Sequence, residues 1–248
     1  MNLKNPAPTR GAGFLYKETE KGMHMEKNLI QIAKEAQPDY ASQIVAVKLN
    51  GEVRDIQTPL SDGDTVGFIE LDSPMGWTIY RRSVLFLLIA AVNRIERSAE
   101  VIAKFTVNKG LYCEIKIPNR EIDPAFIAEV DSAMMAMIAE NLPIIKHSIP
   151  RMEAIELFQK LGRSGKVNLL SELSQEIISI YTCDAYTDYL YGPMLYETKM
   201  LGHYELDFEP FGVLIRTPDE RTNGQVRKRV SQPKFGSILA ESKAWANI

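Results

Sequence analysis

Cysteine and histidine are scarce in this chain of 248 residues, which has two cysteines and three histidines. Cys113 and Cys183 cannot form a zinc cluster alone, and His24, His147 and His203 lie in separate segments without the spacing of metal ligands. Because both cysteines lie among tyrosines and apolar residues, we expect small buried hydrophobic residues, not a disulfide scaffold. The sequence therefore predicts that this chain binds no metal ion and no cofactor.

Phosphate-binding and nucleophile motifs are also lacking. The segment most similar to a P-loop, residues 162–167, has no correctly spaced first glycine, and Val167 offers no hydroxyl for magnesium. We expect it to be a turn that ends a helix. Residues 11–13 lack the third glycine of a dinucleotide-binding loop, and the chain has no Gly-x-Ser-x-Gly nucleophile elbow. No catalytic motif is visible, and whether the chain is an enzyme stays open, since one sequence does not exclude a Ser–His–Asp triad.

Long hydrophobic runs are missing as well. The longest, residues 84–92, has nine residues, which is less than half of a membrane span. Arg81, Arg82 and Arg94 flank it, and no apolar signal-peptide core follows the N-terminus. We therefore expect a buried helix in a cytoplasmic protein without membrane contact.

The net charge of −3 is too small to indicate nucleic-acid binding by the overall field. Basic residues gather only near the C-terminal end, at Arg227, Lys228, Arg229 and Lys234. Such a segment is either a contact for RNA or phosphate or a solvated linker, and the linker is favoured. The remaining composition, with 45% hydrophobic and 25% charged residues, is that of a globular protein.

The first third of the chain alternates between strand and turn patterns. The dipeptide Asn50-Gly51 favours a tight hairpin because both residues tolerate positive φ, and Pro38 is expected to stop a helix. The elements expected here are a hairpin at 13–25, a helix at 26–37 and strands at 44–49, 53–56 and 65–71. After a ragged lead over residues 1–12, this order predicts a β-grasp domain over residues 13–75.

The second region, residues 76–220, mixes apolar helices with short strands. Asp123-Pro124 is a typical N-cap followed by a proline in the first helical turn, and Gly162 is expected to end a helix that opens at Pro150. That helix should point Ile155, Phe158 and Leu161 inward. The other expected elements are a helix at 78–95, a helix bearing Ile127, Val130, Met134 and Ile138 on one face, and strands at 101–107, 111–117, 144–149, 177–181, 204–208 and 212–215.

Two segments in the first region resemble the TGS domain of threonyl-tRNA synthetases and stringent-response enzymes. Residues 45–51 read Val-Ala-Val-Lys-Leu-Asn-Gly, and residues 60–66 read Leu-Ser-Asp-Gly-Asp-Thr-Val. Another β-grasp domain is the alternative. The resemblance implies an α+β chain, with a β-grasp (TGS) domain first.

Four landmarks in the second region resemble the threonyl/alanyl-tRNA-synthetase editing-like domain. They are the helix at 81–91, the strand at 109–115, the stretch at 148–167 and the loop Tyr-Thr-Asp-Tyr-Leu-Tyr-Gly-Pro-Met at 186–194. The resemblance implies an editing-like α+β domain over residues 76–220, followed by a basic tail or linker at 221–248.

The resemblance also implies four zinc ligands, two histidines on the helix and a cysteine and histidine in the loop. In this chain we align those positions with Phe86, Ala90, Leu190 and Met194. Zinc prefers nitrogen, thiolate or carboxylate donors, which phenylalanine, alanine and leucine lack, and a thioether is a poor substitute. We therefore expect an editing fold without its metal.

Uridine-kinase-like (phosphoribulokinase/uridine-kinase-related) proteins join the same two domains. The similar segments are Tyr-Arg-Arg-Ser at 80–83, Phe-Glu-Pro-Phe-Gly-Val-Leu-Ile-Arg-Thr-Pro at 208–218, Pro-Lys-Phe from Pro233, and Trp245. In that family an ATP- and magnesium-dependent kinase domain follows, so the chain is expected to be either a piece of such a protein or a stand-alone relative.

The leading hypothesis from sequence is a non-catalytic accessory or regulatory region of a nucleoside (uridine) kinase, with its own downstream kinase domain as partner. Alternatives are a stand-alone tRNA-binding relative of threonyl-tRNA synthetase and a metal-free hydrolase of misacylated tRNA. A nucleotide or tRNA is the expected ligand of the degenerate cleft, which is either a retained pocket or a closed core. Its expected lining is Phe86, Ala90, Lys109, Tyr112, Asp188, Tyr191 and Met194.

Overall fold

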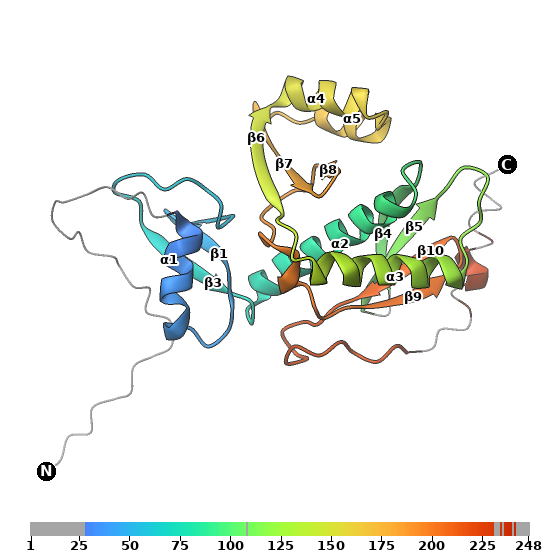
Figure 1. The fold of residues 1–248 in the computed structure, drawn as a ribbon, viewed down its shortest axis with the longest axis horizontal. Helices are drawn as coiled ribbons and strands as arrows, with labels where there is room; N and C mark the ends of the chain where they lie inside the picture. Colours follow the sequence, from blue (N-terminus) through green and yellow to red (C-terminus); the bar gives the residue numbers. More distant parts are fainter. Residues whose placement is uncertain (1–27, 108, 231–233, 235, 240, 242–248) are drawn as a thin grey trace, which may run out of the picture.

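The computed structural model describes residues 28–107, 109–230, 234, 236–239 and 241 of the chain. Three antiparallel sheets, with strand orders β2-β1-β3, β4-β5-β10-β9 and β6-β7-β8, surround one long helix, α2. Figure 1 shows three units along this helix: a small N-terminal unit, a lobe made of α4, α5 and β6–β8, and a larger sheet covered by α3. The expectation of an α+β chain is confirmed.

The N-terminal unit packs one helix against three strands. Asn28 caps the helix, since its side chain accepts a hydrogen bond from Gln31 N at 3.0 Å. At the hairpin, Asn50 and Gly51 have φ values of 51° and 86°, which confirms the predicted turn. The elements are α1 (Leu29–Ala36), a 3₁₀ turn (Gln37–Asp39), β1 (Ile44–Leu49), β2 (Glu52–Arg54) and β3 (Val66–Glu70).

Two expected elements of this unit, the lead at 1–12 and the hairpin at 13–25, lie outside the described residues. Three strands and one helix are common to many small α+β units, and the β-grasp order depends on the missing hairpin. The TGS assignment therefore stays a prediction.

Helix α2 (Pro74–Ile95) is the core helix of the molecule. It begins four residues before the expected start because Ser73 Oγ accepts a hydrogen bond from Gly76 N at 3.0 Å and Pro74 occupies the first turn. By length and composition this helix could cross a membrane, but 67% of its most apolar window is buried inside the fold. The expectation of a buried helix is confirmed.

The largest sheet contains β4 (Glu100–Val107), β5 (Gly110–Lys116), β9 (Glu205–Glu209) and β10 (Gly212–Arg216). Helix α3 (Pro124–Ala139) packs against α2 and the sheet. Asp123 Oδ1 accepts from Phe126 N at 2.8 Å, as the cap motif predicts. Ile127, Val130 and Met134 are buried and Ile138 is partly buried against the same core, in agreement with the predicted apolar face.

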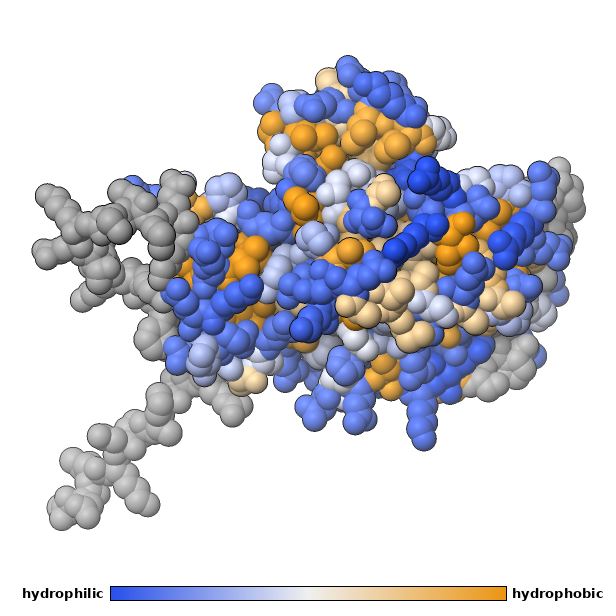
Figure 2. All heavy atoms as spheres, viewed as in Figure 1, coloured by the Kyte–Doolittle hydropathy of each residue, from blue (hydrophilic) through white to orange (hydrophobic). Residues whose placement is uncertain are grey.

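The small lobe contains β6 (Ile145–Pro150), α4 (Arg151–Lys160), α5 (Ser164–Ser171), β7 (Ile177–Cys183) and β8 (Tyr186–Asp188). Ile155 and Phe158 are buried as expected, but the inward placement of Leu161 is wrong, because its side chain is 47% exposed beyond the end of α4. The segment read as a turn at 162–167 also begins a second helix, α5. Figure 2 shows apolar side chains gathered on this lobe.

The segment after β10 folds back onto its own sheet. Arg227 forms an ion pair with Asp219 at 3.2 Å, and Arg229 contacts Glu209. These two arginines are therefore partnered by carboxylates of the same chain, which differs from the solvated linker that the sequence favoured.

Candidate ligand-binding cleft

The middle of α2 is sealed against the loop that follows β8. Phe86 and Met194 are 0% exposed, and the ring centroid of Phe86 lies 5.7 Å from that of Tyr186. Leu195 N donates a hydrogen bond to Ser83 Oγ at 2.9 Å, which ties the loop to the helix. At this point the closed core, and not an open pocket, is what the structure shows.

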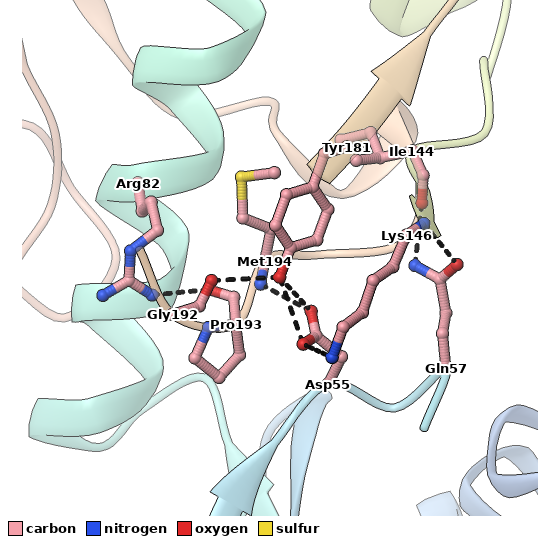
Figure 3. Close-up of polar contacts among 9 residues, drawn as sticks. All are labelled: Asp55, Gln57, Arg82, Ile144, Lys146, Tyr181, Gly192, Pro193 and Met194. Carbon is pink, nitrogen blue, oxygen red and sulfur yellow. Dashed lines mark hydrogen bonds and ion pairs between the residues drawn. The ribbon is translucent and has the colours of Figure 1, made fainter. Parts of the chain in front are cut away.

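One helical turn before Phe86, the side chain of Arg82 reaches the same loop. Its Nη1 donates to the carbonyl oxygen of Pro193 (Figure 3). Gly192 has a φ of +90°, and a Cβ placed there would lie 2.9 Å from Arg82 Cζ. Only glycine allows both this backbone conformation and the close approach of the guanidinium.

Arg82 was missed among the expected cleft residues, although the Tyr-Arg-Arg-Ser motif had drawn attention to it. The structure shows that Arg82 and Phe86 face the loop. Ala90, one turn further on, instead lines a surface hollow beside the second half of α2. The three residues share a helix face at a spacing of four. Which two of these residues contact the loop after β8 depends on where the loop lies along the helix.

Asp55 anchors the loop from the N-terminal unit. It lies just after β2, is 3% exposed, and accepts hydrogen bonds from three different segments (Figure 3). Lys146 Nζ lies at 2.8 Å, the Tyr181 hydroxyl at 2.9 Å and Met194 N at 3.0 Å. One buried carboxylate therefore joins the N-terminal unit, the small lobe and the loop.

A second residue of the N-terminal unit strengthens this junction. The Gln57 side chain donates to Ile144 O at 2.7 Å and accepts from Lys146 N at 3.2 Å. The Tyr181 hydroxyl also lies 3.0 Å from Gly192 O. Burial, together with the charge of Asp55, raises the pKa of Tyr181, so the hydroxyl stays protonated and available as a donor.

Beside the sealed region lies an open cavity of about 660 Å³, here called the basic pocket. Its walls come from the first half of α2, the β4–β5 turn, the loop after β8 and the segment after β10. Its cationic residues are Arg81, Arg82 and Lys109, and Tyr191 lies at its edge with 76% of its surface exposed. The apolar lining is Leu85, Leu111, Leu190, Ile215 and Pro218.

The cations of the basic pocket feel the charge of nearby carboxylates, Lys109 that of Asp219 and Arg82 that of Asp55, but form no direct ion pair with them. Within the described part of the chain, no ion pair involves Arg81, Arg82 or Lys109. Asp219, the acidic residue of the lining, is already paired with Arg227. Burial lowers the pKa of Arg82, but a guanidinium stays charged at neutral pH.

The other hollow, here called the distal hollow, lies along the second half of α2 and has a volume of about 520 Å³. Arg94 contacts Glu140 at 3.2 Å and Asp184 at 3.8 Å. Arg163 lies 4.5 Å over the ring of Tyr186. Two of the three arginines in the lining are therefore already partnered, and the third, Arg97, is exposed.

The expected cleft residues are divided among several places. Lys109 and Tyr191 meet in the basic pocket, and Ala90 lines the distal hollow. Tyr112 is 3% exposed in β5, where its hydroxyl donates to Pro210 O at 2.7 Å. Phe86 and Met194 fill the sealed region between them.

The sequence had suggested that Asp188 lies at the polar mouth of the cleft, but the structure buries it elsewhere. It is 2% exposed, accepts from the Tyr186 hydroxyl at 2.8 Å, and pairs with Lys166 Nζ at 2.9 Å. Lys166 comes from α5, the helix that sequence reasoning had taken for a turn. The unexpected helix thus supplies the cation that covers this carboxylate.

No three His, Cys, Asp or Glu side chains among residues 28–107 and 109–230 gather in a way that could hold a metal ion. The side chains at the four positions aligned with zinc ligands are all uncharged and carry no nitrogen, thiolate or carboxylate donor. A metal-free cleft stays a prediction for elemental analysis.

Comparison with known proteins gives one consistent similarity. The chain is 27% identical over 204 residues to the threonine–tRNA ligase of Acidithiobacillus ferrooxidans (strain ATCC 53993 / BNL-5-31), covering 82% of this chain and 30% of that protein. It is 27% identical over 179 residues to the threonine–tRNA ligase of Francisella tularensis subsp. novicida, covering 72% and 28%, and 27% identical over 191 residues to that of Geobacillus sp. (strain WCH70), covering 77% and 29%.

No protein-family model matches the chain. The chain spans about 30% of the length of these curated relatives. None of the three names points to a nucleoside kinase, so the kinase setting inferred from sequence gains no support. The similarities support a domain related to threonyl-tRNA synthetase.

Proposed function

We propose that this chain is a binding module related to the N-terminal region of threonyl-tRNA synthetase, which holds the acceptor end of tRNA without hydrolysing it. The basic pocket is the observation that supports this function. It places Arg81, Arg82 and Lys109 beside an exposed tyrosine, at the edge of a cleft whose centre is sealed by Phe86 and Met194.

Single-stranded nucleic acid is bound by combining cations for the phosphates with aromatic rings for the bases. Tyr191 supplies an exposed ring, and the pocket cations come from two different elements. The binding is local, because the whole chain has a net charge of −3. Its salt dependence should therefore reflect a few contacts and not a large basic face.

Hydrolysis is not part of the proposal. The described residues that line the basic pocket include no histidine and no cysteine, and the positions aligned with zinc ligands hold no zinc donor. The N-terminal unit, which we propose to be a TGS domain, would add a second surface, held in place by Asp55. The named relatives favour this RNA-binding function over an accessory role for a kinase.

The test is fluorescence anisotropy of labelled tRNA with the full chain over a series of salt concentrations. The variant Arg81→Gln/Lys109→Asn removes two exposed pocket cations, and asparagine tolerates the φ of 61° at residue 109. We expect about tenfold weaker binding and a salt slope shallower by roughly two units.

The matched control is Arg97→Gln/Lys116→Gln, which removes two exposed cations outside the basic pocket. It should leave the affinity within about twofold of the original chain. Absence of tRNA binding, or an equal loss in the control, would show the proposed function to be wrong. Release of the amino acid from aminoacyl-tRNA would contradict the non-hydrolytic part.

A further inference from the structure

We infer that the basic pocket recognises a phosphate monoester attached to a planar base, that is, a nucleotide with a terminal phosphate. The inference deepens the proposed function and rests on it where the ligand is the 5′-phosphate that a tRNA carries at its acceptor end. A free mononucleotide presents the same chemistry.

The charge of the pocket favours a phosphomonoester over a phosphodiester. Three cationic side chains line it, and its carboxylate, Asp219, is already neutralised by Arg227. A backbone phosphodiester carries one negative charge, and an aminoacyl end adds a positive amine. A phosphomonoester carries about 1.5 to 2 negative charges at neutral pH, so it balances more of the unpaired charge.

Arg82 is built into the pocket as a positioned donor. Its single hydrogen bond within the described part of the chain is the one to Pro193 O, and it is half-buried. A guanidinium has five N–H donors in a fixed plane. The Pro193 contact therefore fixes the orientation of the group and leaves other donors for a phosphate, a geometry suited to bidentate contact.

Two further cations complete the charged side of the basic pocket. Arg81 lies on α2 next to Arg82, and Lys109 comes from the β4–β5 turn. Lys109 lies at the β4–β5 turn with a φ of 61°, directly before Gly110. A Cβ at Gly110 would lie 2.7 Å from Ile215 O, so this turn packs closely on β10. The lysine backbone is thereby fixed, while its side chain is exposed; Arg81 is exposed as well and donates to Thr78 Oγ1 at 3.1 Å.

The remaining lining suits the base of a nucleotide. Leu85, Leu111 and Ile215 form apolar walls, and the Tyr191 ring lies at the edge. A volume of about 660 Å³ falls in the range of pockets for small ligands, roughly 300 to 1,000 Å³. Inorganic phosphate alone would leave this apolar surface uncovered, so it should bind more weakly than a nucleotide.

The experiment is isothermal titration of the full chain with four small probes: inorganic phosphate, uridine, UMP and AMP. We expect at least one mononucleotide to bind about tenfold more tightly than uridine and than phosphate, because each supplies only half of the contacts. The Arg81→Gln/Lys109→Asn variant should lose about tenfold for the mononucleotide, while Arg97→Gln/Lys116→Gln should not.

Two further probes distinguish the source of the phosphate: the trinucleotide CCA with and without a 5′-phosphate. Binding of the phosphorylated trinucleotide but not of the mononucleotides assigns the site to an RNA end, and the reverse assigns it to a free nucleotide. The inference is overturned if phosphate-bearing probes bind no more tightly than uridine and unphosphorylated CCA, or if the control loses as much affinity as the pocket variant.

Failure of this inference is separable from failure of the proposed function. If tRNA binds but neither mononucleotides nor phosphorylated CCA compete for the pocket, the terminal-phosphate inference is wrong and the tRNA-binding module stands. If mononucleotides bind and tRNA does not, the proposed function is wrong and the pocket assignment stands.

Discussion

The two hollows along α2 contain similar residues but differ in how their charges are satisfied. In the distal hollow, Arg94 pairs with Glu140 and Asp184, and Arg163 lies over the ring of Tyr186. In the basic pocket, Arg81 and Arg82 have no ion-pair partner among the described residues. A count of positive residues would not separate the two places.

The difference shows that a ligand site is recognised less by the presence of charged side chains than by whether those side chains already have partners in the chain. A cation that its own chain already neutralises contributes to stability, whereas a half-buried guanidinium without a carboxylate lacks a counter-charge that a ligand can supply. Arg82 is such a group: it donates its hydrogen bond to the carbonyl of Pro193, and the charge of Asp55 offsets its desolvation only in part, since burial still lowers its pKa. The basic pocket is the better ligand site for that reason.

The largest expected effect comes from removing the wall between the hollows. Phe86→Ala deletes a fully buried ring that packs against Tyr186, and should lower the free energy of unfolding by about 3–5 kcal/mol. Chemical denaturation measures this if the domain unfolds in one transition.

The matched control is Phe105→Ala, the same substitution at a ring that is 46% exposed. It should cost about 1 kcal/mol or less. Equal losses in the two variants would mean that Phe86 does not separate two hollows but lines an open one.

The next effect concerns the anchor of the loop. Asp55→Asn removes the charge that Lys146, Tyr181 and Met194 N share, and should cost about 3 kcal/mol, since Lys146 is left without its partner. Denaturation of this variant and of Asp62→Asn, an exposed position in the same unit, measures it.

Asp55→Asn should also weaken ligand binding in the basic pocket, because the loop with Leu190 and Tyr191 is less firmly held. The lining of the distal hollow includes none of Asp55, Lys146, Tyr181 and Met194, so this hollow should keep its structure. A variant that is destabilised but binds ligand as before would show that the anchor and the pocket are independent.

The local signals in the sequence located most elements correctly. The Asn50-Gly51 turn and the Asp123 cap depend on neighbouring residues only, and both form as expected. Helix α5 was missed because Gly162, with a φ of +69°, ends one helix and a second helix begins two residues later. A glycine that ends one helix carries no information about the conformation of the residues after it.

The site was predicted less well than the fold, because the burial of a residue depends on which elements pack over it. Lys109 and Tyr191, both expected in the cleft, line the basic pocket, but Asp188, expected with Lys109 at a polar mouth, is covered by Lys166 of the missed helix. Arg82 was overlooked because nothing in its neighbours reveals that Gly192 will lie against it. These contacts join residues about 20 to 110 positions apart, where local patterns carry no information.

A smaller effect tests how much the ion pair between Arg94 and Glu140 in the distal hollow contributes to stability. Glu140→Gln removes the carboxylate that contacts Arg94 at 3.2 Å, with both side chains about 40% exposed. Solvent screening should limit the loss of stability to under 1 kcal/mol, and added salt should reduce it further. Glu153→Gln, on the exposed side of α4, is the control. A loss above about 2 kcal/mol would mean that Arg94 is a structural centre and that the two hollows differ in more than ligand capacity.

The smallest expected effect is the absence of thiol reactivity in the native chain. Cys183 lines the distal hollow but is 1% exposed, and burial, followed by the charge of Asp184, raises its pKa to about 11. Burial alone raises the pKa of Cys113 to about 12. At pH 8 only about one Cys183 in a thousand is a thiolate, which is the reactive form. We therefore expect no labelling by Ellman's reagent in the native chain and labelling of both thiols in denaturant.

The single-cysteine variants Cys113→Ser and Cys183→Ser assign any signal to one position. Combined with Phe86→Ala, they report how each thiol responds when the wall between the hollows is removed. Cys183 should become reactive before Cys113, because it lines the hollow that the missing ring would open, whereas Cys113 lies in β5 between two neighbouring strands. Native labelling of Cys183 in the unmodified chain would mean that reagents already enter the distal hollow, and that hollow would then compete with the basic pocket as a ligand site.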